Sequence, residues 1–356
     1  MSSKVKLNWR CTSINEFILN IPTSATHIYG ADAEKCYEKP PLTGPDSLTE
    51  ALNWFVTQCF CFATNSVPRN GRLYLYYRCN AARGLRSKAF VQICGWFTQA
   101  QAPTGSFRMT SRYLLKLTDL ILSNILIRVG QSAYRQLLGF PMGYHCSSCF
   151  CDIWFIRYEY THVQRAVLLK AYAIAAQSLY AFRYQDDLTV INAPGITSCL
   201  NPSEPRTHTN PFWIYPLNLV TMTDTTVYDN LDNVDTSLSF LSCLLSPLHD
   251  GALTYCKYQR TRELPFTVLA YTKHDSLTPN VSKYRIVSSE LTSISLVSRC
   301  LADFIPETVR LFSVLVNDNG LDKRTVCKEI ERWCISTAPF LPLRFSTDEL
   351  YAAMPL

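Results

Sequence analysis

The segment from Ser178 to Asn192 constrains the fold of this chain more than any other. Apolar and aromatic residues fill both of its halves, and two adjacent acids, Asp186 and Asp187, stand between them. Two such runs around a short polar stretch predict two β-strands joined by a tight turn. An exposed pair of aspartates is simply solvated by water. A pair held on a hairpin that an apolar core positions is unfavourable unless a cation neutralises it.

A third acid, Asp32, ends another β-like run that begins at His27. Three carboxylates held on one small sheet suit two divalent metals about 3.5–4 Å apart, which clamp the attacking and leaving oxygens of a phosphoryl transfer. Mg²⁺ takes hard oxygen ligands of this kind and keeps waters for substrate phosphates. We therefore predict that Asp32, Asp186 and Asp187 bind two Mg²⁺ ions, with Mn²⁺ as a substitute.

The composition indicates an ordered chain of two or three packed subdomains. It has 356 residues, of which 47% are hydrophobic and 17% are charged, and a formal charge of +6 that permits phosphate binding without requiring it. The 15 cysteines are odd in number and scattered, and the N-terminus has no hydrophobic signal core. We expect an intracellular protein, nuclear or cytoplasmic. The most apolar stretch, 114–129, contains three charged residues, so we expect no membrane span.

Capping and periodicity signals predict the other elements. Asp46 or Ser47 can cap a helix, with Glu50 at capping-box spacing from Ser47. Further expected elements are a helix after Thr110 that carries apolar residues as far as Leu126, a helix from Ser147 at least as far as Tyr160, a hairpin of 240–248 and 253–258, and helical segments at 291–304 and 321–333 separated by 317–320.

Three segments, in matching order, resemble the reverse transcriptases. Tyr184-Gln185-Asp186-Asp187 is similar to their Tyr-x-Asp-Asp signature, and the segment from Ile28 to Tyr37 resembles their first palm motif, in which an aromatic residue follows an acid by five positions. Between them, the segment from Gln136 to Gly143 resembles the loop that supports the template and the incoming nucleotide. Its Gln-x-x-Gly-x-Pro-Met-Gly form is most similar to Penelope-like retroelements and the related telomerase-type enzymes.

The resemblance implies a role for each matching residue. Asp32, Asp186 and Asp187 would be metal ligands, together with the backbone carbonyl of Ala33. Tyr37 would be the gate that excludes a ribose 2′-hydroxyl. Lys257 would donate a proton to the leaving pyrophosphate, with a solvated lysine on a hairpin edge as the alternative. The further nucleotide-binding residues would be Gln136, Gly139, Pro141, Gly143 and Tyr184.

The resemblance also implies an α+β right-hand polymerase, whose palm is an antiparallel sheet with helices. Residues 1–60 would begin the palm with the first catalytic motif, 61–135 would form a fingers-like insertion, 136–285 the rest of the palm and 286–356 a helical thumb. Only 31 residues precede Asp32. We therefore expect the N-terminal fingers of this family to be truncated.

A basic stretch with interleaved tyrosines lies within the expected insertion. Basic and aromatic residues together suit a single-stranded nucleic acid, through phosphate contacts and base stacking, although an ordinary solvated surface has the same composition. The expected nucleic-acid path contains Arg69, Arg72, Tyr76, Arg78, Arg83, Arg86 and Lys88.

The function that these predictions imply is RNA-directed DNA synthesis by a retroelement enzyme. Its partners would be an RNA template, a DNA primer and deoxynucleoside triphosphates. One alternative is a truncated or degenerate remnant that is not catalytic and at most binds nucleic acid. A second is an RNA-dependent RNA polymerase, which Tyr37 at the gate position disfavours. The segment that contains Cys146, Cys149 and Cys151 includes the Cys-x-x-Cys spacing of zinc ligands, but no second ligand pair follows, so cysteines of the core are favoured.

Overall fold

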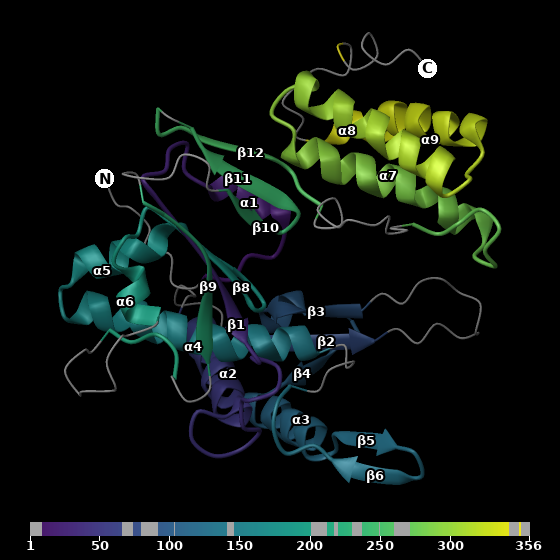
Figure 1. Ribbon diagram of the computed structural model, residues 1–356. Helices are drawn as coiled ribbons and strands as arrows, with labels where there is room; N and C mark the ends of the chain where they lie inside the picture. Colours follow the sequence, from purple (N-terminus) through teal and green to yellow (C-terminus); the bar gives the residue numbers. More distant parts are fainter. Residues whose placement is uncertain are drawn as a thin grey trace. The chain divides into compact units, whose positions relative to one another are not determined.

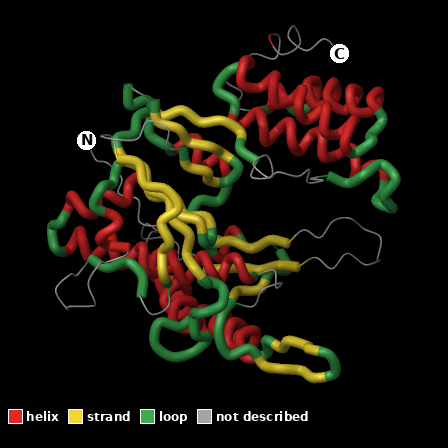
Figure 2. Tube along the Cα trace, in the orientation of Figure 1, coloured by secondary structure: helices red, strands yellow, loops and turns green. Residues whose placement is uncertain are grey.

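The computed structural model describes residues 9–65, 74–79, 92–102, 104–140, 146–200, 212–216, 220–229, 237–248, 250–259, 271–341 and 349. Helices and antiparallel strands both contribute to the structure (Figures 1 and 2). The predicted α+β class is therefore confirmed. The chain forms two compact units, of which the first contains residues 33–175 and 198–222 and the second contains residues 9–32, 176–197 and 223–356.

A four-stranded sheet has the order β7-β8-β1-β9. Its strands are β1 (His27–Glu34), β7 (Ala181–Tyr184), β8 (Asp187–Ile191) and β9 (Thr221–Asp229). β8 pairs antiparallel with both β7 and β1, so the predicted hairpin and the predicted strand before Asp32 are confirmed. The prediction that the first hairpin strand begins at Ser178 is wrong, because Ser178–Tyr180 forms a 3₁₀ turn.

One face of this sheet packs on a core within the second unit. Ile28, Phe182 and Ile191 join buried residues of α1 (Ile14–Asn20) and of a second sheet. The Phe17 ring meets the Phe182 ring edge-on at a centroid distance of 5.0 Å. Because i and i+2 residues of a strand share a face, this core fixes which side chains of β1, β7 and β8 emerge beside it.

The second sheet contains β10 (Leu238–Phe240), β11 (Cys243–Pro247) and β12 (Leu253–Lys257). The hairpin of β11 and β12 is confirmed, but Phe240 belongs to a separate strand that pairs with β11. Leu241 and Ser242 both have positive φ, which makes the tight turn between β10 and β11. A local left-handed turn of two non-glycine residues has no signal in the sequence.

The C-terminal helices are α7 (Asn280–Val297), α8 (Leu301–Ser313) and α9 (Lys323–Ser336), with a short π-helix at Val314–Asp318. They enclose a core in which the Phe304 and Trp333 rings stack at 5.8 Å. The predicted separation near 317–320 is confirmed. The prediction of one helix over 291–304 is wrong, because the chain leaves the helix at Ser298 and α8 begins at Leu301.

In the first unit, α2 (Leu48–Asn65) begins at the predicted capping box. Its Ser47 hydroxyl accepts from the Glu50 amide at 3.2 Å, and the Glu50 carboxylate accepts from the Asp46 amide at 2.9 Å. The helix packs on α3 (Ser111–Ser123) and α4 (Ser147–Leu168). α4 begins where predicted and runs eight residues beyond Tyr160.

The end predicted for α3 is wrong. The helix stops at Ser123, where the Asn124 side chain donates to the Leu120 carbonyl at 2.6 Å. The chain then forms a hairpin of β5 (Leu126–Val129) and β6 (Ser132–Arg135). Asparagine competes for helix carbonyls in this way, and β-branched residues follow it, so local chemistry ends the helix.

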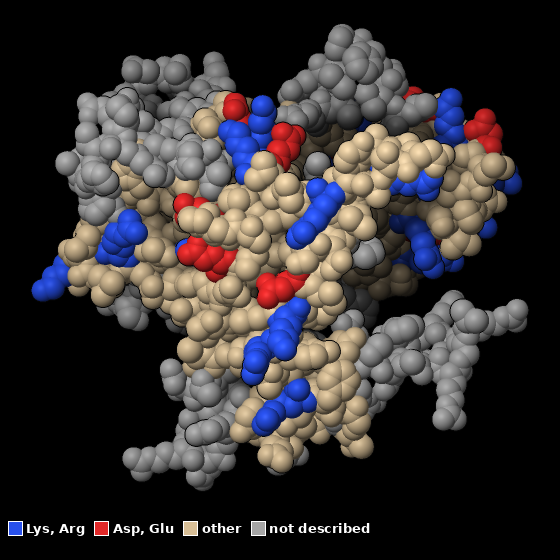
Figure 3. Space-filling view, turned by 90° about the horizontal axis from the view of Figure 1, so that it is seen from below, with Lys and Arg blue, Asp and Glu red and all other residues tan. Residues whose placement is uncertain are grey.

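The remaining elements are short. A third sheet has the order β3-β2-β4. These elements are β2 (Tyr74–Cys79), β3 (Gln92–Phe97), β4 (Phe107–Met109), α5 (Tyr172–Gln177), α6 (Ile196–Leu200) and 3₁₀ turns at Gln99–Gln101 and Ala338–Phe340. No helix in the described part of the chain combines the length and apolarity that a bilayer crossing requires. Figure 3 shows acidic and basic side chains interspersed on the face it presents.

Candidate active site

The register of the four-stranded sheet brings two of the predicted metal ligands face to face. Asp32 of β1 lies directly opposite Asp187 of β8, and Asp187 lies opposite Tyr184 of β7. Directly opposed residues share a face of the sheet, with Cβ atoms about 4.5–5.5 Å apart. Tyr184, Asp187 and Asp32 therefore form a row across three strands, which we call the acidic row. Asp186 lies in the hairpin turn, immediately before Asp187.

The turn itself is left-handed at a residue that is not glycine. Gln185 has φ +55°, a conformation that costs an L-residue about 1–2 kcal/mol. Gln185 and Asp186 are the two residues between the paired ends of β7 and β8, so their backbone sets where the acids point. Strained backbone of this kind clusters at active sites and ligand clamps.

A buried arginine, Arg183, braces this turn from the opposite face. Its side chain is fully buried, and its Nη1 donates to the Gln185 carbonyl at 3.0 Å. Its backbone amide and carbonyl bond to Trp9 and Cys11 at 2.6 and 2.7 Å, which covers the outer edge of β7. The role of Arg183 was not predicted from the sequence. A lone charge among the apolar residues of a strand is the signal that could have revealed it.

The carboxylates of the acidic row and of the adjacent turn fit a hard divalent cation. Asp32, Asp186 and Asp187 offer only carboxylate oxygens, the ligand type that Mg²⁺ prefers. No group of three or more His, Cys, Asp or Glu side chains among the described residues is already arranged around a metal position. On the same face, the Thr189 hydroxyl is buried, and within the described chain it has no hydrogen-bond partner. A buried orphan polar atom beside carboxylates is typical of a site for water or an ion.

Two other predicted motifs contact each other within the first unit. The amide of Phe140 donates to the Tyr37 carbonyl at 2.8 Å, and the amide of Gly139 donates to the Pro40 carbonyl at 2.8 Å. The Tyr37 and Phe140 rings meet edge-on at 5.7 Å. Tyr37 itself is half-buried in a turn whose first residue, Lys35, has φ +52°. The predicted gate residue is therefore held by the predicted nucleotide-support loop.

Gly139 makes this contact possible. Its φ is +81°, and a Cβ atom there would collide with the Tyr37 carbonyl oxygen and lie 3.1 Å from Glu38 Cα. The Gln136 side chain bonds the Leu138 and Phe140 carbonyls at 2.8 and 3.2 Å and so braces the same loop. The close backbone approach expected at Gly139 exists, but its partner in this structure is the Tyr37–Glu38 backbone.

The other predicted nucleotide and nucleic-acid residues are only partly placed. Most of them lie outside the described residues. These are Pro141, Gly143, Arg69, Arg72, Arg83, Arg86, Lys88 and the side chain of Arg78. Tyr76 is only 8% exposed, which leaves too little of its ring for a base to stack on. The Arg108 guanidinium lies 4.9 Å from the Tyr74 ring on the same sheet, a contact that the sequence did not predict. The Ala33 carbonyl accepts from the Cys36 amide at 3.3 Å.

Lys257 of β12 is engaged with α7. Its ammonium donates to Ser293 Oγ at 2.5 Å and lies 3.9 Å from Glu290, and its side chain is 7% exposed. These contacts fasten β12 to the helical core of the second unit. They give Lys257 a structural role and contradict the alternative of a solvated lysine, while its role as a proton donor stays a prediction.

The cysteines near the start of α4 point in different directions. Cys149 is exposed, whereas Cys151 is fully buried and Cys146 is half-buried. Side chains at i and i+2 of a helix do not face each other. The interpretation as core is therefore right for Cys151 but wrong for Cys149.

Buried polar groups fasten the segment 212–216 to α4. The Tyr215 hydroxyl donates to the buried Glu159 carboxylate at 3.0 Å. Burial is the main cause that lowers the pKa of His162 to about 4, while a hydrogen bond to the Phe212 backbone opposes it. His162 is therefore neutral in the folded chain at neutral pH.

Because of His162, we expect the folded chain to lose stability in acid. Below pH 6.5 the unfolded chain protonates His162, whereas the folded chain does so only near pH 4. Unfolding then takes up a proton, so the free energy of unfolding falls as the pH drops through this window, by up to about 3 kcal/mol. Urea unfolding from pH 7 to pH 4 measures the fall. His162→Gln should flatten it, and an identical slope in both proteins would contradict the assignment.

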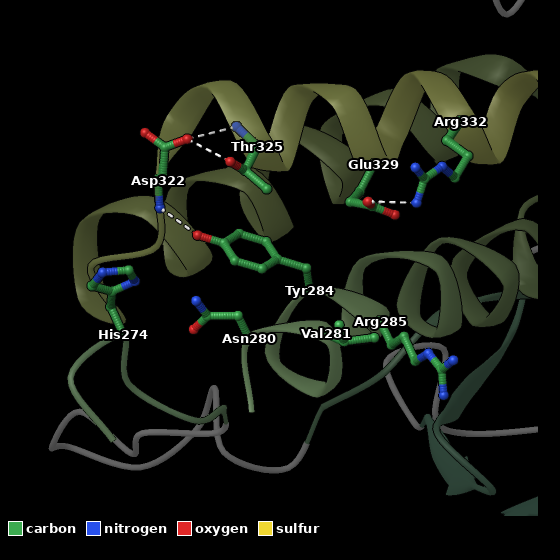
Figure 4. A pocket seen from close by; sticks show the side chains of 9 residues that line it. All are labelled: His274, Asn280, Val281, Tyr284, Arg285, Asp322, Thr325, Glu329 and Arg332. Carbon is green, nitrogen blue, oxygen red and sulfur yellow. Dashed lines mark hydrogen bonds and ion pairs between the residues drawn. The ribbon is translucent and has the colours of Figure 1, made fainter. Parts of the chain in front are cut away.

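A separate cavity of about 610 Å³ lies between α7 and α9 (Figure 4). The Tyr284 hydroxyl accepts from the Asp322 amide at 3.1 Å, Asp322 caps α9 through the Thr325 amide at 2.8 Å, and Glu329 pairs with Arg332 at 2.8 Å. Glu329 and Arg332 therefore neutralise each other, and the Asp322 carboxylate is engaged in the helix cap. The cavity shares no residue with the acidic row.

No protein-family model matches this chain, and a search of curated proteins finds no match. The functional assignment therefore depends on the residues and their geometry.

Proposed function

We propose that this chain is an RNA-directed DNA polymerase of a retroelement, similar to the Penelope-like reverse transcriptases. The observation that carries the proposal is the register that sets Asp32 directly opposite Asp187, beside the turn that contains Asp186. Asp32, which is far from the other two acids in the sequence, is thereby anchored on the same small sheet as Asp187. Nucleotidyl transfer requires little more from a protein than such acids and accurate positioning.

Asp32, Asp186 and Asp187 would hold two Mg²⁺ ions, with the Ala33 carbonyl as a further ligand. When bound, the ions activate the primer 3′-hydroxyl and neutralise the triphosphate. The chain's own contribution is to fix the carboxylates. The β8 register positions Asp187, the core beneath Phe182 and Ile191 holds the strands, and Arg183 secures the turn.

Tyr37 would select deoxynucleotides by occupying the space of a ribose 2′-hydroxyl. Its backbone and ring are both held by the Gly139–Phe140 segment, so the gate is rigid rather than a mobile side chain. A rigid wall discriminates by steric exclusion, which suits a choice between substrates that differ by one hydroxyl. An aromatic residue fixed at this position also favours an RNA-directed DNA polymerase over an RNA-dependent RNA polymerase.

The architecture proposed for this function is the polymerase right hand. The sheet of β1, β7, β8 and β9 would be the palm. The insertion would contain α3 and the two small sheets around it, and α7, α8 and α9 would be the thumb. The RNA template, the DNA primer and the deoxynucleoside triphosphates would be the partners.

The test is primer extension on poly(rA)/oligo(dT) with Mg²⁺. We expect the purified chain to extend the primer with deoxythymidine triphosphate, with Asp186→Asn as the negative control. Tyr37→Ala should raise incorporation of the ribonucleotide relative to the deoxynucleotide by roughly tenfold or more, because a lost steric contact changes discrimination by 1–3 kcal/mol. A folded chain that extends no primer, with Mg²⁺ or Mn²⁺, would overturn the proposal in favour of a non-catalytic remnant.

A further inference from the structure

We propose that Thr189 is a positioning residue of the acidic row, and that its hydroxyl bonds a water molecule or a carboxylate oxygen that a bound divalent cation fixes in place. This inference rests on the proposed metal site and adds a residue to it.

Thr189 lies on the same face of the sheet as the acidic row. It follows Asp187 by two positions in β8, and residues at i and i+2 of a strand point to the same side. Its cross-strand neighbours are Gly30 of β1 and Phe182 of β7. Glycine has no side chain and phenylalanine has no hydrogen-bonding atom. Neither cross-strand side chain can therefore satisfy the hydroxyl.

The nearest polar side chains on this face of the paired strands belong to the acidic row. Asp187 is two residues along the same strand, and Asp32 is the diagonal neighbour across β1, at a typical separation of about 7–8 Å. That separation is between residue positions, and the Asp32 side chain shortens it. One ordered water bridges two polar atoms up to about 5.5 Å apart, the length of two hydrogen bonds. Carboxylates that hold a metal are commonly hydrogen-bonded by a further group, which orients them.

Stability alone would favour valine at this position. The Thr189 side chain is fully buried, and within the described residues its hydroxyl bonds to nothing. Leaving such a group unsatisfied is unfavourable, whereas an apolar group of the same shape is neutral or stabilising. Valine also suits a central strand at least as well. A buried hydroxyl on the same face as Asp32 and Asp187 therefore indicates a group that is satisfied when the site is occupied.

Terbium luminescence tests this, because Tb³⁺ takes the same oxygen ligands and Tyr184 lies beside Asp187 as a sensitiser. The full chain would be titrated with Tb³⁺ and then with competing Mg²⁺, and the signal that Asp186→Asn retains would be subtracted as background. We expect Thr189→Val to bind both ions about tenfold more weakly, with an unchanged or higher Tm. Thr189→Ser keeps the hydroxyl and loses a methyl group, so it should restore affinity and lower the Tm.

The possible outcomes distinguish a failure of this inference from a failure of the proposed metal site on which it rests. Wild-type affinity in Thr189→Val, with Asp186-dependent binding intact, would overturn the role of Thr189 and leave the metal site standing. A fall in the Tm of Thr189→Val that matches its loss of affinity would assign the residue to the fold and overturn the inference. Wild-type protein with no Asp186-dependent binding would overturn the metal site and the inference together.

Discussion

Replacing Asp32 with asparagine is expected to reduce primer extension roughly a thousandfold, the scale of losing one preorganised electrostatic group from an active site. The same change should leave the metal-free chain at least as stable as the wild type. Asp32 lies directly opposite Asp187, and like charges at such a position are destabilising. Asparagine keeps the shape and removes the charge, so the free energy of unfolding in EDTA should be unchanged or higher by up to about 1 kcal/mol.

Asp250→Asn is the matched control for this substitution. Asp250 lies in the turn between β11 and β12, where its carboxylate accepts from the Ala252 amide at 2.9 Å. The same loss of charge there should leave extension unchanged. Retained extension by Asp32→Asn would show that Asp32 is not a metal ligand. A loss of several kcal/mol in its unfolding free energy would instead show that the carboxylate supports the fold.

The features that the sequence predicted correctly are local ones. The β7–β8 hairpin follows from apolar runs around a polar turn, and the capping box of α2 follows from residues three positions apart. The acidic pair in the turn could be recognised in the same way. In each case the residues that decide the structure are neighbours in the chain, so the sequence states the interaction directly.

The pairing of Asp32 with Asp187 could not be read from the sequence. A shift of one residue in the β1–β8 register would move every side chain to the other face, and only the packing of Ile28 and Ile191 on a common core fixes it. Arg183 was missed for a similar reason. Its role depends on a hydrogen bond to the Gln185 carbonyl in the turn. It also depends on a segment distant in the sequence, Trp9 to Cys11, which pairs with its strand.

At Gly139 the predicted close approach of the backbone exists, but the group that approaches is not the predicted one. From the sequence we predicted that Gly139 allows the backbone to approach a nucleotide closely. The structure shows a glycine whose backbone approaches the Tyr37 turn instead, with the support loop and the gate residue bonded together. The sequence could indicate that a side chain was not tolerated there, but not which group excludes it.

Gly139→Ala is therefore expected to destabilise the chain by about 3 kcal/mol, from the strain of positive φ together with overpacking. The added Cβ would collide with the Tyr37 carbonyl oxygen and push the Glu38 backbone away. Because this contact holds the gate, the variant should also incorporate ribonucleotides more readily than the wild type. Urea unfolding measures the first effect, and competitive incorporation of ribo- and deoxynucleotides measures the second.

Gly130→Ala separates backbone strain from the collision. Gly130 has φ +63° in the β5–β6 turn, and nothing lies within 4 Å of a Cβ atom built there. Alanine at this position carries the strain of left-handed backbone alone, about 1 kcal/mol, and should not change nucleotide selection. Equal losses of stability in the two variants would show that the Tyr37 loop yields freely to the added methyl group. The gate would then be held by the Tyr37 and Phe140 rings rather than by the backbone of Gly139.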